Sequence, residues 1–368
     1  MFRLNQFDAN NIKQFLKHKT YRNINLYIDF DNMLFGIYYP EVYCSQTSYI
    51  QAIITAIETS IKRLYAIYKN FETDFEHVNV ICFAAFGKEK LREIDSEYKK
   101  RNKLNYTVAL DVLNFIRQNA NTNDFIKGTR QIVLKITQLI LNKAFKDFCF
   151  VISENIDSDI IPYYVINWLN NQKTAHVIIS SDKDFIQLLS NKHIYQYRTT
   201  YKKSVFTSNN VMKNYTVLEQ ASIDTEIKPF KNSLLNVLYF AIIGDTTDNI
   251  KPLIKRYRLK SKINIVTELS KYEDLEIETI EQLQKVVSLS NRNFDNDFKQ
   301  PITKDSIKEN PVHKNLTLVS FELQDRFIID NSTRLNLRNQ VDLLKQGNET
   351  PFEYANNIVW QLFRIKLF

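Results

Sequence analysis

Cysteine and histidine are scarce in this chain of 368 residues, which has three cysteines and five histidines. Cys44, Cys82 and Cys149 lie far apart, which excludes both a disulfide framework and a zinc finger. No histidines have the spacing of a helical zinc motif such as H-E-x-x-H. Any metal ion in this protein must therefore have oxygen ligands. Because Cys82 and Cys149 stand in apolar runs, we expect both to be small core residues.

Long apolar runs are also missing. No stretch reaches the ~18–20 residues that a helix needs to cross a bilayer, and the N-terminal segment is too polar for a signal peptide. The sequence therefore predicts a soluble, cytoplasmic protein without a membrane partner. A hydrophobic content of 44% excludes wholesale disorder, and the length allows two domains.

The charge is unbalanced, with a formal net value of +8 and a pI near 9.0. A basic surplus favours a polyanionic partner, either nucleic acid or an anionic membrane surface. The alternative is a solvated basic surface that binds neither.

What the chain does contain is an alternation of apolar runs and helical patterns. Four short β-branched runs predict strands buried on both faces, at 25–30, 78–86, 147–153 and 176–181. Helical patterns follow between and after them, at 47–70, 128–146 and 159–171. This order predicts an α/β fold with a mainly parallel central sheet flanked by helices. After residue 228 the pattern becomes helical to the C-terminus, interrupted by a predicted polar loop at 291–311.

Aspartates gather where the predicted strands end. Asp29 ends the first strand, Asp157 and Asp159 follow the third, and Asp182 and Asp184 follow the fourth in "HVIISSDKDF". Parallel strands bring these carboxylates to one edge of the sheet, where their mutual repulsion favours a divalent cation. Two such ions can activate water and stabilise the leaving oxygen of a phosphodiester. The alternative is that the aspartates only cap helices and turns.

Four blocks resemble the 5′→3′ exonuclease and flap endonuclease family, which has a PIN-like fold, and are most similar to its phage members, among them the T-even phage ribonuclease H. The blocks are "LYIDFDNMLFGIYY", "FGKEKLREIDSEYKKRNK", "VIISSDKDFIQLL" and "IIGDTTDNI". They span about residues 24–250 in the family order, and the last third matches only in being helical.

The resemblance implies three parts, an N-terminal extension (1–20), a PIN-like 5′ nuclease catalytic domain with a helical arch (21–225) and a mainly helical DNA-binding domain (226–368). It implies Mg²⁺ or Mn²⁺, two ions, as cofactors. The implied metal ligands are Asp29, Asp157, Asp159, Asp182, Asp184, Asp245 and Asp248.

The resemblance also implies roles for basic and aromatic residues. Arg92 and Lys99 polarise the scissile phosphate, and Tyr98 either stacks on a base or packs beneath the arch. Further expected nucleic-acid contacts are Lys100, Arg101, Lys103, Lys251, Lys255, Arg256 and Arg258. The last four stand where the family has a glycine-rich hairpin, and the alternative for them is a solvated helix face.

Two departures from the family pattern concern the site. Ala84 and Ala85 stand where the second metal aspartate is expected, and Ser158 replaces a carboxylate beside Asp159. Asp157 and Glu154 are the carboxylates nearest in sequence to that gap.

The implied activity is hydrolysis of phosphodiesters near 5′ ends, flaps or nicks of DNA, and of RNA paired to DNA, as in primer removal during phage replication in a bacterial host. A sliding clamp, which the apolar C-terminal tail would contact, and a single-strand-binding protein are further candidate partners. The main alternative is an impaired family member that binds DNA without cutting it. Two others are an interaction protein whose acidic edge binds a basic partner and a phosphatase with an aspartate nucleophile.

Overall fold

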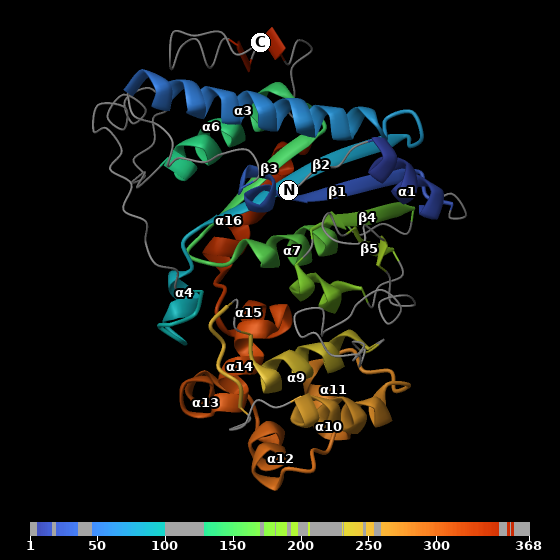
Figure 1. The fold of residues 1–368 in the computed structure, drawn as a ribbon, viewed down its shortest axis with the longest axis vertical. Helices are drawn as coiled ribbons and strands as arrows, with labels where there is room; N and C mark the ends of the chain where they lie inside the picture. The colour runs from blue at the N-terminus through green and yellow to red at the C-terminus, as the bar shows by residue number, and fades with distance from the viewer. Residues whose placement is uncertain are drawn as a thin grey trace.

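The centre of the molecule is a six-stranded sheet with the strand order β3-β2-β1-β4-β5-β6 (Figure 1). The computed structural model describes residues 6–16, 20–35, 46–99, 129–169, 173–180, 182–189, 193–197, 205–206, 230, 232–245, 248–253, 259–345, 352–353 and 355–356. The strands are β1 (Asn23–Asp29), β2 (His77–Phe86), β3 (Phe148–Glu154), β4 (Thr174–Ile179), β5 (Ile194–Tyr197) and β6 (Val205–Phe206). The first five run parallel and β6 pairs antiparallel with β5. The predicted α/β class with a mainly parallel sheet is confirmed.

The sheet is covered on both faces, which explains why its strands are continuously apolar. On one face lie the N-terminal helix and the two long helices seen above the strands in Figure 1, namely α1 (Gln6–Leu16), α3 (Gln46–Lys69) and α6 (Thr129–Ala144). On the other face lie α7 (Ile161–Trp168) and α16 (Asn331–Val341). Alternation along β1 illustrates the two faces, since Leu26 and Ile28 join the first core while Tyr27 joins the second.

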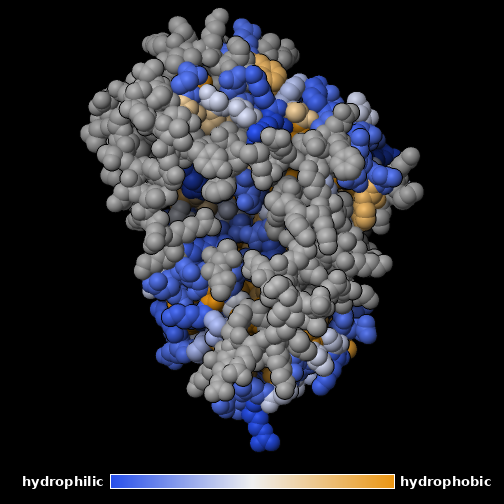
Figure 2. Space-filling view, in the orientation of Figure 1, coloured by the Kyte–Doolittle hydropathy of each residue, from blue (hydrophilic) through white to orange (hydrophobic). Residues whose placement is uncertain are grey.

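Beyond residue 232 every described element is a helix, apart from an isolated bridge between Asp245 and Ile250. The helices are α9 (Ser233–Ile243), α10 (Leu259–Leu269), η4 (Ser270–Tyr272), α11 (Ile280–Val286), α12 (Arg292–Lys299), α13 (Lys304–Glu309), α14 (Pro311–Val319), α15 (Phe321–Phe327), α16 and η5 (Asp342–Lys345). The wholly buried α9 lies at the centre of their core. Figure 2 shows mainly hydrophilic side chains on the described outer surface of these helices.

The predicted polar loop at 291–311 is wrong, because this stretch forms α12 and α13. The Asn291 side chain caps α12 by accepting from the backbone N–H of Phe294 at 3.4 Å. Thr303 and Ser306 form a capping box at the start of α13. Phe298 is fully buried, so one aromatic anchor and good caps are enough to fix a very polar helix.

The expectation for the cysteines in the apolar runs is confirmed. Cys82 and Cys149 are free and buried in the sheet, and burial raises the pKa of both thiols. In the described part of the chain, no helix has the length and apolar character required to span a membrane.

Candidate metal and nuclease site

The predicted carboxylates meet at the edge where the parallel strands end. Asp29 is the last residue of β1, and Asp157 lies three residues beyond the end of β3. Asp159 is in the short helix η2 (Ser158–Ile160) and Asp184 is in η3 (Lys183–Leu188), which Asp182 caps. Asp245 and Asp248 come from the loop that follows α9. Lys99 contacts Asp157, Asp159 and Asp248, which shows that distant segments converge as the strand order predicts.

Asp29 is fixed by its neighbours and by burial. Its Oδ1 accepts the backbone N–H of Asn32 at 3.1 Å, and its Oδ2 accepts the Ser180 hydroxyl at 3.3 Å and the Asn32 side chain. Burial, followed by the nearby charge of Asp31, raises the pKa of Asp29 to about 7. A carboxyl with such a pKa changes its charge near neutral pH.

The Ser-Asp-Lys-Asp turn is built by hydrogen bonds to Ser180 and Gln196. The Asp182 N–H donates to the Ser180 hydroxyl at 3.1 Å, and the Asp182 Oδ1 accepts the Asp184 N–H at 3.0 Å. Gln196 on β5 donates its side-chain amide to the carbonyl groups of Ser180 and Asp182. Burial, then the charges of Asp182 and Asp248, raises the pKa of Asp184 well above its ordinary value.

The loop after α9 depends on a glycine. Gly244 has φ +72°, and a Cβ at this position would lie 2.5 Å from the backbone oxygen of Ile250. Asp245 and Ile250 exchange backbone hydrogen bonds of 2.9 and 2.8 Å, which closes the loop tightly. The Gly-Asp-x-x-Asp-Asn block therefore places Asp245 at this bridge and Asp248 two residues before Ile250.

Lys99 is the main counter-charge of the cluster. Its Nζ lies 2.8 Å from Asp157 Oδ2, 3.1 Å from Asp159 Oδ2 and 3.1 Å from Asp248 Oδ2, and the residue is 8% exposed. Burial alone would lower the pKa of Lys99, but Asp157 and the other acidic neighbours raise it well above its ordinary value. The ammonium is therefore firmly charged.

The carboxylates that share Lys99 have pKa values that are shifted in different directions. Burial would raise the pKa of Asp157, but Lys99 and Lys88 outweigh it and lower this pKa. Burial, then the charge of Asp157, raises the pKa of Asp159 well above the usual range. Burial raises the pKa of Asp248 to about 6 although Lys99 opposes it.

Two lysines that the sequence reasoning missed offset part of the negative charge of the cluster. Lys88 Nζ lies 2.7 Å from both oxygens of Asp157, and Lys183 Nζ lies 2.6 Å from Asp245 Oδ2. Burial would lower the pKa of Lys183, yet Asp245 raises it. The available signal was position, because both lysines stand within four residues of a strand end on the acidic edge.

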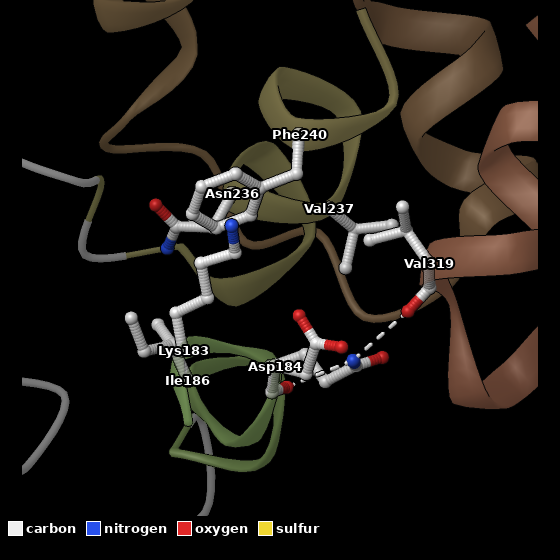
Figure 3. Close-up of a pocket in the computed structure, with 8 residues that line it drawn as sticks. Lys183, Asp184, Ile186, Asn236, Val237, Phe240 and Val319 are labelled. Atoms are coloured by element: carbon white, nitrogen blue, oxygen red, sulfur yellow. Dashed lines mark hydrogen bonds between the residues drawn. The ribbon is translucent and has the colours of Figure 1, made fainter. Parts of the chain in front are cut away.

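Lys183 and Asp184 also border a small pocket between η3 and α9 (Figure 3). About 10 Å³ of it is open to a water-sized molecule, which is room for one water. Asn236, Val237 and Phe240 form the α9 side of this pocket. It is therefore a solvent niche beside the carboxylates and is too small for a nucleotide.

Arg92 and Tyr98 face the protein. The Arg92 guanidinium donates to the carbonyl groups of Tyr98 and Lys99, both at 3.4 Å. Tyr98 is 2% exposed and its hydroxyl donates to Asp157 Oδ2 at 3.2 Å. Tyr98 is therefore buried, while residues 100–128, where the arch is expected, lie outside the described residues.

The remaining predicted contacts are only partly described. Lys251 is exposed on the turn after the Asp245–Asp248 loop. Lys100, Arg101, Lys103, Lys255, Arg256 and Arg258 lie outside the described residues.

The end of β2 carries a different arrangement from the expected carboxylate. Ala85 is buried, and its carbonyl accepts Arg130 Nη2 at 3.0 Å. Arg130 Nε also donates to Asp31 Oδ1 at 2.8 Å. Ser158 donates to Asp159 Oδ1 at 3.4 Å, so it supports that carboxylate instead of adding another.

The fit of divalent cations to this edge follows from its donors. Among the described residues no three acidic or imidazole side chains stand at a spacing that would hold one ion. The donors are nevertheless the carboxylates that hard cations prefer. Lys88, Lys99 and Lys183 lie within ion-pair distance of Asp157, Asp159, Asp245 and Asp248. The donor chemistry fits such ions, provided that Lys99 gives up some of its carboxylate contacts.

Several solved structures resemble the chain in fold. A protein of T5 co-crystallised with metal ions has a TM-score of 0.48 at 13% identity, covering 93% of this chain and 100% of that one. A bacteriophage T5 flap endonuclease in a complex with DNA and metal ions has a TM-score of 0.43 at 13% identity, covering 93% and 99%. The catalytic core of Rad2 in complex with DNA substrate has a TM-score of 0.34 at 10% identity, covering 96% and 91%. No family model and no curated protein matches the chain. At these values the similarities assign no activity.

Proposed function

We propose that the protein is a metal-dependent 5′ nuclease that hydrolyses phosphodiesters near 5′ ends, flaps or nicks of DNA. One observation carries the proposal. Buried and half-buried aspartates from four distant segments share one edge of a parallel sheet, and burial and mutual repulsion raise the pKa values of Asp29, Asp159, Asp184 and Asp248. Holding so many carboxylates together is unfavourable for the fold alone, and functional sites are where such arrangements are found.

The cofactors in this proposal are two Mg²⁺ or Mn²⁺ ions. The residues that would hold them are Asp29, Asp159, Asp182, Asp184, Asp245 and Asp248. When bound, the ions supply Lewis acidity and lower the pKa of water.

The protein's own groups supply position and charge. Lys99 pairs with Asp159 and Asp248, and if these aspartates held ions its ammonium would be available to a substrate phosphate. Arg92 holds the carbonyl groups of Tyr98 and Lys99, so it acts by fixing the turn that carries the ammonium. Asn32 and Ser180 orient Asp29, and Gln196 orients the Asp182 turn.

Recognition is proposed to depend on nucleic-acid structure and not on sequence. The net charge of +8 favours backbone contacts, which carry no base information. RNA paired to DNA is included among the substrates for the same reason. Primer removal in a phage-infected bacterial cytoplasm is the proposed setting, with a sliding clamp and a single-strand-binding protein as partners. Docking on the clamp through the C-terminal tail involves residues 357–368, which lie outside the described residues.

The direct test uses a 5′-flapped duplex, labelled at either end in separate reactions, with Mg²⁺, Mn²⁺ or EDTA. We expect short 5′ products with either metal, none with EDTA and none from Asp182→Asn. A parallel reaction with an RNA–DNA hybrid measures the substrate range. The proposed activity is wrong if the wild-type protein binds the flap but leaves it intact in both metals.

That outcome would support the second candidate, a DNA-binding protein with an impaired site. The observation that favours it is that Ala85 brings no carboxylate to the end of β2, where Arg130 bonds the Ala85 carbonyl and pairs with Asp31. The variant Arg130→Ala tests whether this guanidinium impairs the site. Cleavage that appears or increases in the variant would support impairment, whereas nearly unchanged cleavage would show that Arg130 only pairs with Asp31.

A further inference from the structure

We propose that Asp157 is a positioning residue for Lys99 and lies outside the metal ligand set; this inference rests on the function proposed above. The sequence alone made Asp157 one of seven equivalent carboxylates. Its contacts set it apart from the other six.

Both oxygens of Asp157 are already engaged by the chain. Lys88 Nζ lies 2.7 Å from Oδ1 and from Oδ2, Lys99 Nζ lies 2.8 Å from Oδ2, and the Tyr98 hydroxyl donates to Oδ2 at 3.2 Å. The side chain is only 3% exposed. A buried carboxylate between two ammonium groups has its charge compensated by the protein itself.

The two lysines bracket a single segment. Lys88 precedes the short helix α4 (Glu89–Arg92), and Lys99 ends the turns that follow it. One carboxylate from the loop after β3 therefore fixes both ends of residues 88–99. Lys88 is the N-cap residue of α4, and its ammonium, which cannot accept a backbone N–H, donates to Asp157 instead.

The conformation at Lys99 requires such support. Lys99 has φ +45°, in the left-handed region that is unfavourable for residues other than glycine. Its N–H donates to the Asp248 carbonyl at 2.8 Å, and Arg92 holds its carbonyl from the other side. Asp157 holds the side chain of Lys99, because its Oδ2 lies 2.8 Å from the Lys99 Nζ. The ammonium is therefore held at the acidic edge.

Asp159 and Asp248 differ from Asp157 in a way that suits ion binding. Each has one ammonium, that of Lys99, within ion-pair distance among the described residues. Each would give up one ammonium contact when a cation binds, whereas Asp157 would have to give up two.

The first test measures Mn²⁺ binding by calorimetry without DNA, which is independent of nuclease activity. Asp157→Asn keeps the shape of the side chain, and Asp182→Asn is the matched change at a proposed ligand. We expect the Kd of Asp157→Asn to stay within about threefold of wild type and that of Asp182→Asn to rise about tenfold or more. Equal weakening in the two variants would overturn the proposal.

The second test is a double-mutant cycle on the single-turnover cleavage rate at saturating metal. We expect Asp157→Asn to slow cleavage by about 100-fold, the usual effect of misplacing a catalytic group. In a Lys99→Met background the same change should slow it no further, because Asp157 acts through Lys99. Full additivity would show that Asp157 acts elsewhere and would overturn the proposal.

A third measurement stands even if the wild-type protein cuts no DNA. Amide hydrogen exchange of residues 88–99 in Asp157→Asn should speed up by about tenfold at Lys99, whose N–H is bonded to Asp248. Lys88→Met, which keeps Asp157, should loosen the start of the segment and leave Mn²⁺ affinity intact. Unchanged exchange in both variants would overturn the positioning role, whereas failure of the nuclease assay alone would contradict only the proposed function.

Discussion

At the scale of single residues, the raised pKa of Asp29 makes a prediction about pH. Its pKa of about 7 in the folded protein lies above that of an unfolded aspartate, so the folded state binds more protons between about pH 4 and 7. The free energy of unfolding of the metal-free protein should therefore fall as the pH rises through this window. Asp29→Asn should remove part of the slope and stabilise the metal-free protein at pH 8 by on the order of 2 kcal/mol. Denaturant unfolding in EDTA at several pH values measures this, and parallel curves for the two proteins would contradict it.

With a divalent cation bound, the free energy of unfolding should instead rise with pH. Asp29 and Asp248 must be ionised to bind a cation, and their pKa values are about 7 and about 6. We expect Mg²⁺ at about 100 times its Kd to stabilise the protein by about 2.7 kcal/mol at pH 8, and to have little effect at pH 5. Thermal unfolding with and without Mg²⁺ at the two pH values gives the result. An equal shift at both pH values would indicate that the ion binds elsewhere.

The sequence predicted which carboxylates meet, but it did not predict which of them have a lysine ammonium as partner. Asp29 and Asp182 stand directly at strand ends, and parallel strands fix where those ends lie. Lys88 and Lys183 are ordinary surface residues in a pattern analysis, since their partners Asp157 and Asp245 come from other segments. Charge pairing of this kind depends on side-chain directions that spacing does not contain.

At the scale of elements, the loop after α9 offers a clean comparison of two glycines. At Gly244 a methyl group would meet the backbone of Ile250 and Pro252, which cannot move cheaply. At Gly87 it would meet only the flexible side chain of Glu89, although both positions have positive φ. We expect Gly244→Ala to lower the free energy of unfolding by about 2–4 kcal/mol and Gly87→Ala by about 1 kcal/mol. Chemical denaturation measures both.

The Gly244→Ala variant should also bind Mg²⁺ more weakly, because the same turn carries Asp245 and Asp248. Gly87→Ala serves as the control for positive φ alone. Equal losses of stability in the two variants would show that backbone strain, and not the close approach to Ile250, sets the requirement for glycine at residue 244.

Elements with a strong apolar pattern were predictable, and polar ones were not. The strands β1 to β4 and the helix α3 are close to their predicted ranges because both faces of the sheet are buried. In contrast, α12 depends on the Asn291 cap and one buried ring, that of Phe298. Such a helix owes its stability to tertiary packing, which is not visible in a local window of sequence.

At the scale of the whole molecule, Gln187 connects the carboxylate edge to the C-terminal helices. Its side-chain amide donates to the carbonyl groups of Asp184 at 2.9 Å and Val319 at 3.1 Å, the two bonds drawn in Figure 3. Its oxygen accepts the Phe321 N–H at 2.9 Å. One side chain thus joins η3 to the junction of α14 and α15.

A second glutamine, Gln340 on α16, makes hydrogen bonds with both the backbone N–H and the carbonyl of Ile152 on β3. The C-terminal helices are therefore held against the sheet at more than one point.

This connection predicts that Gln187→Leu affects the metal site as well as stability. Losing the three bonds leaves partly buried carbonyl and N–H groups unpaired, which should lower the free energy of unfolding by about 1–3 kcal/mol. Because Asp184 lies on the same short helix, the affinity for Mg²⁺ should fall too, by calorimetry. Gln324→Leu is the matched control, since Gln324 donates to the Leu318 carbonyl within the C-terminal helices. It should lose stability but keep its Mg²⁺ affinity. If both variants bind Mg²⁺ as the wild type does, the C-terminal helices support the fold without acting on the carboxylate edge.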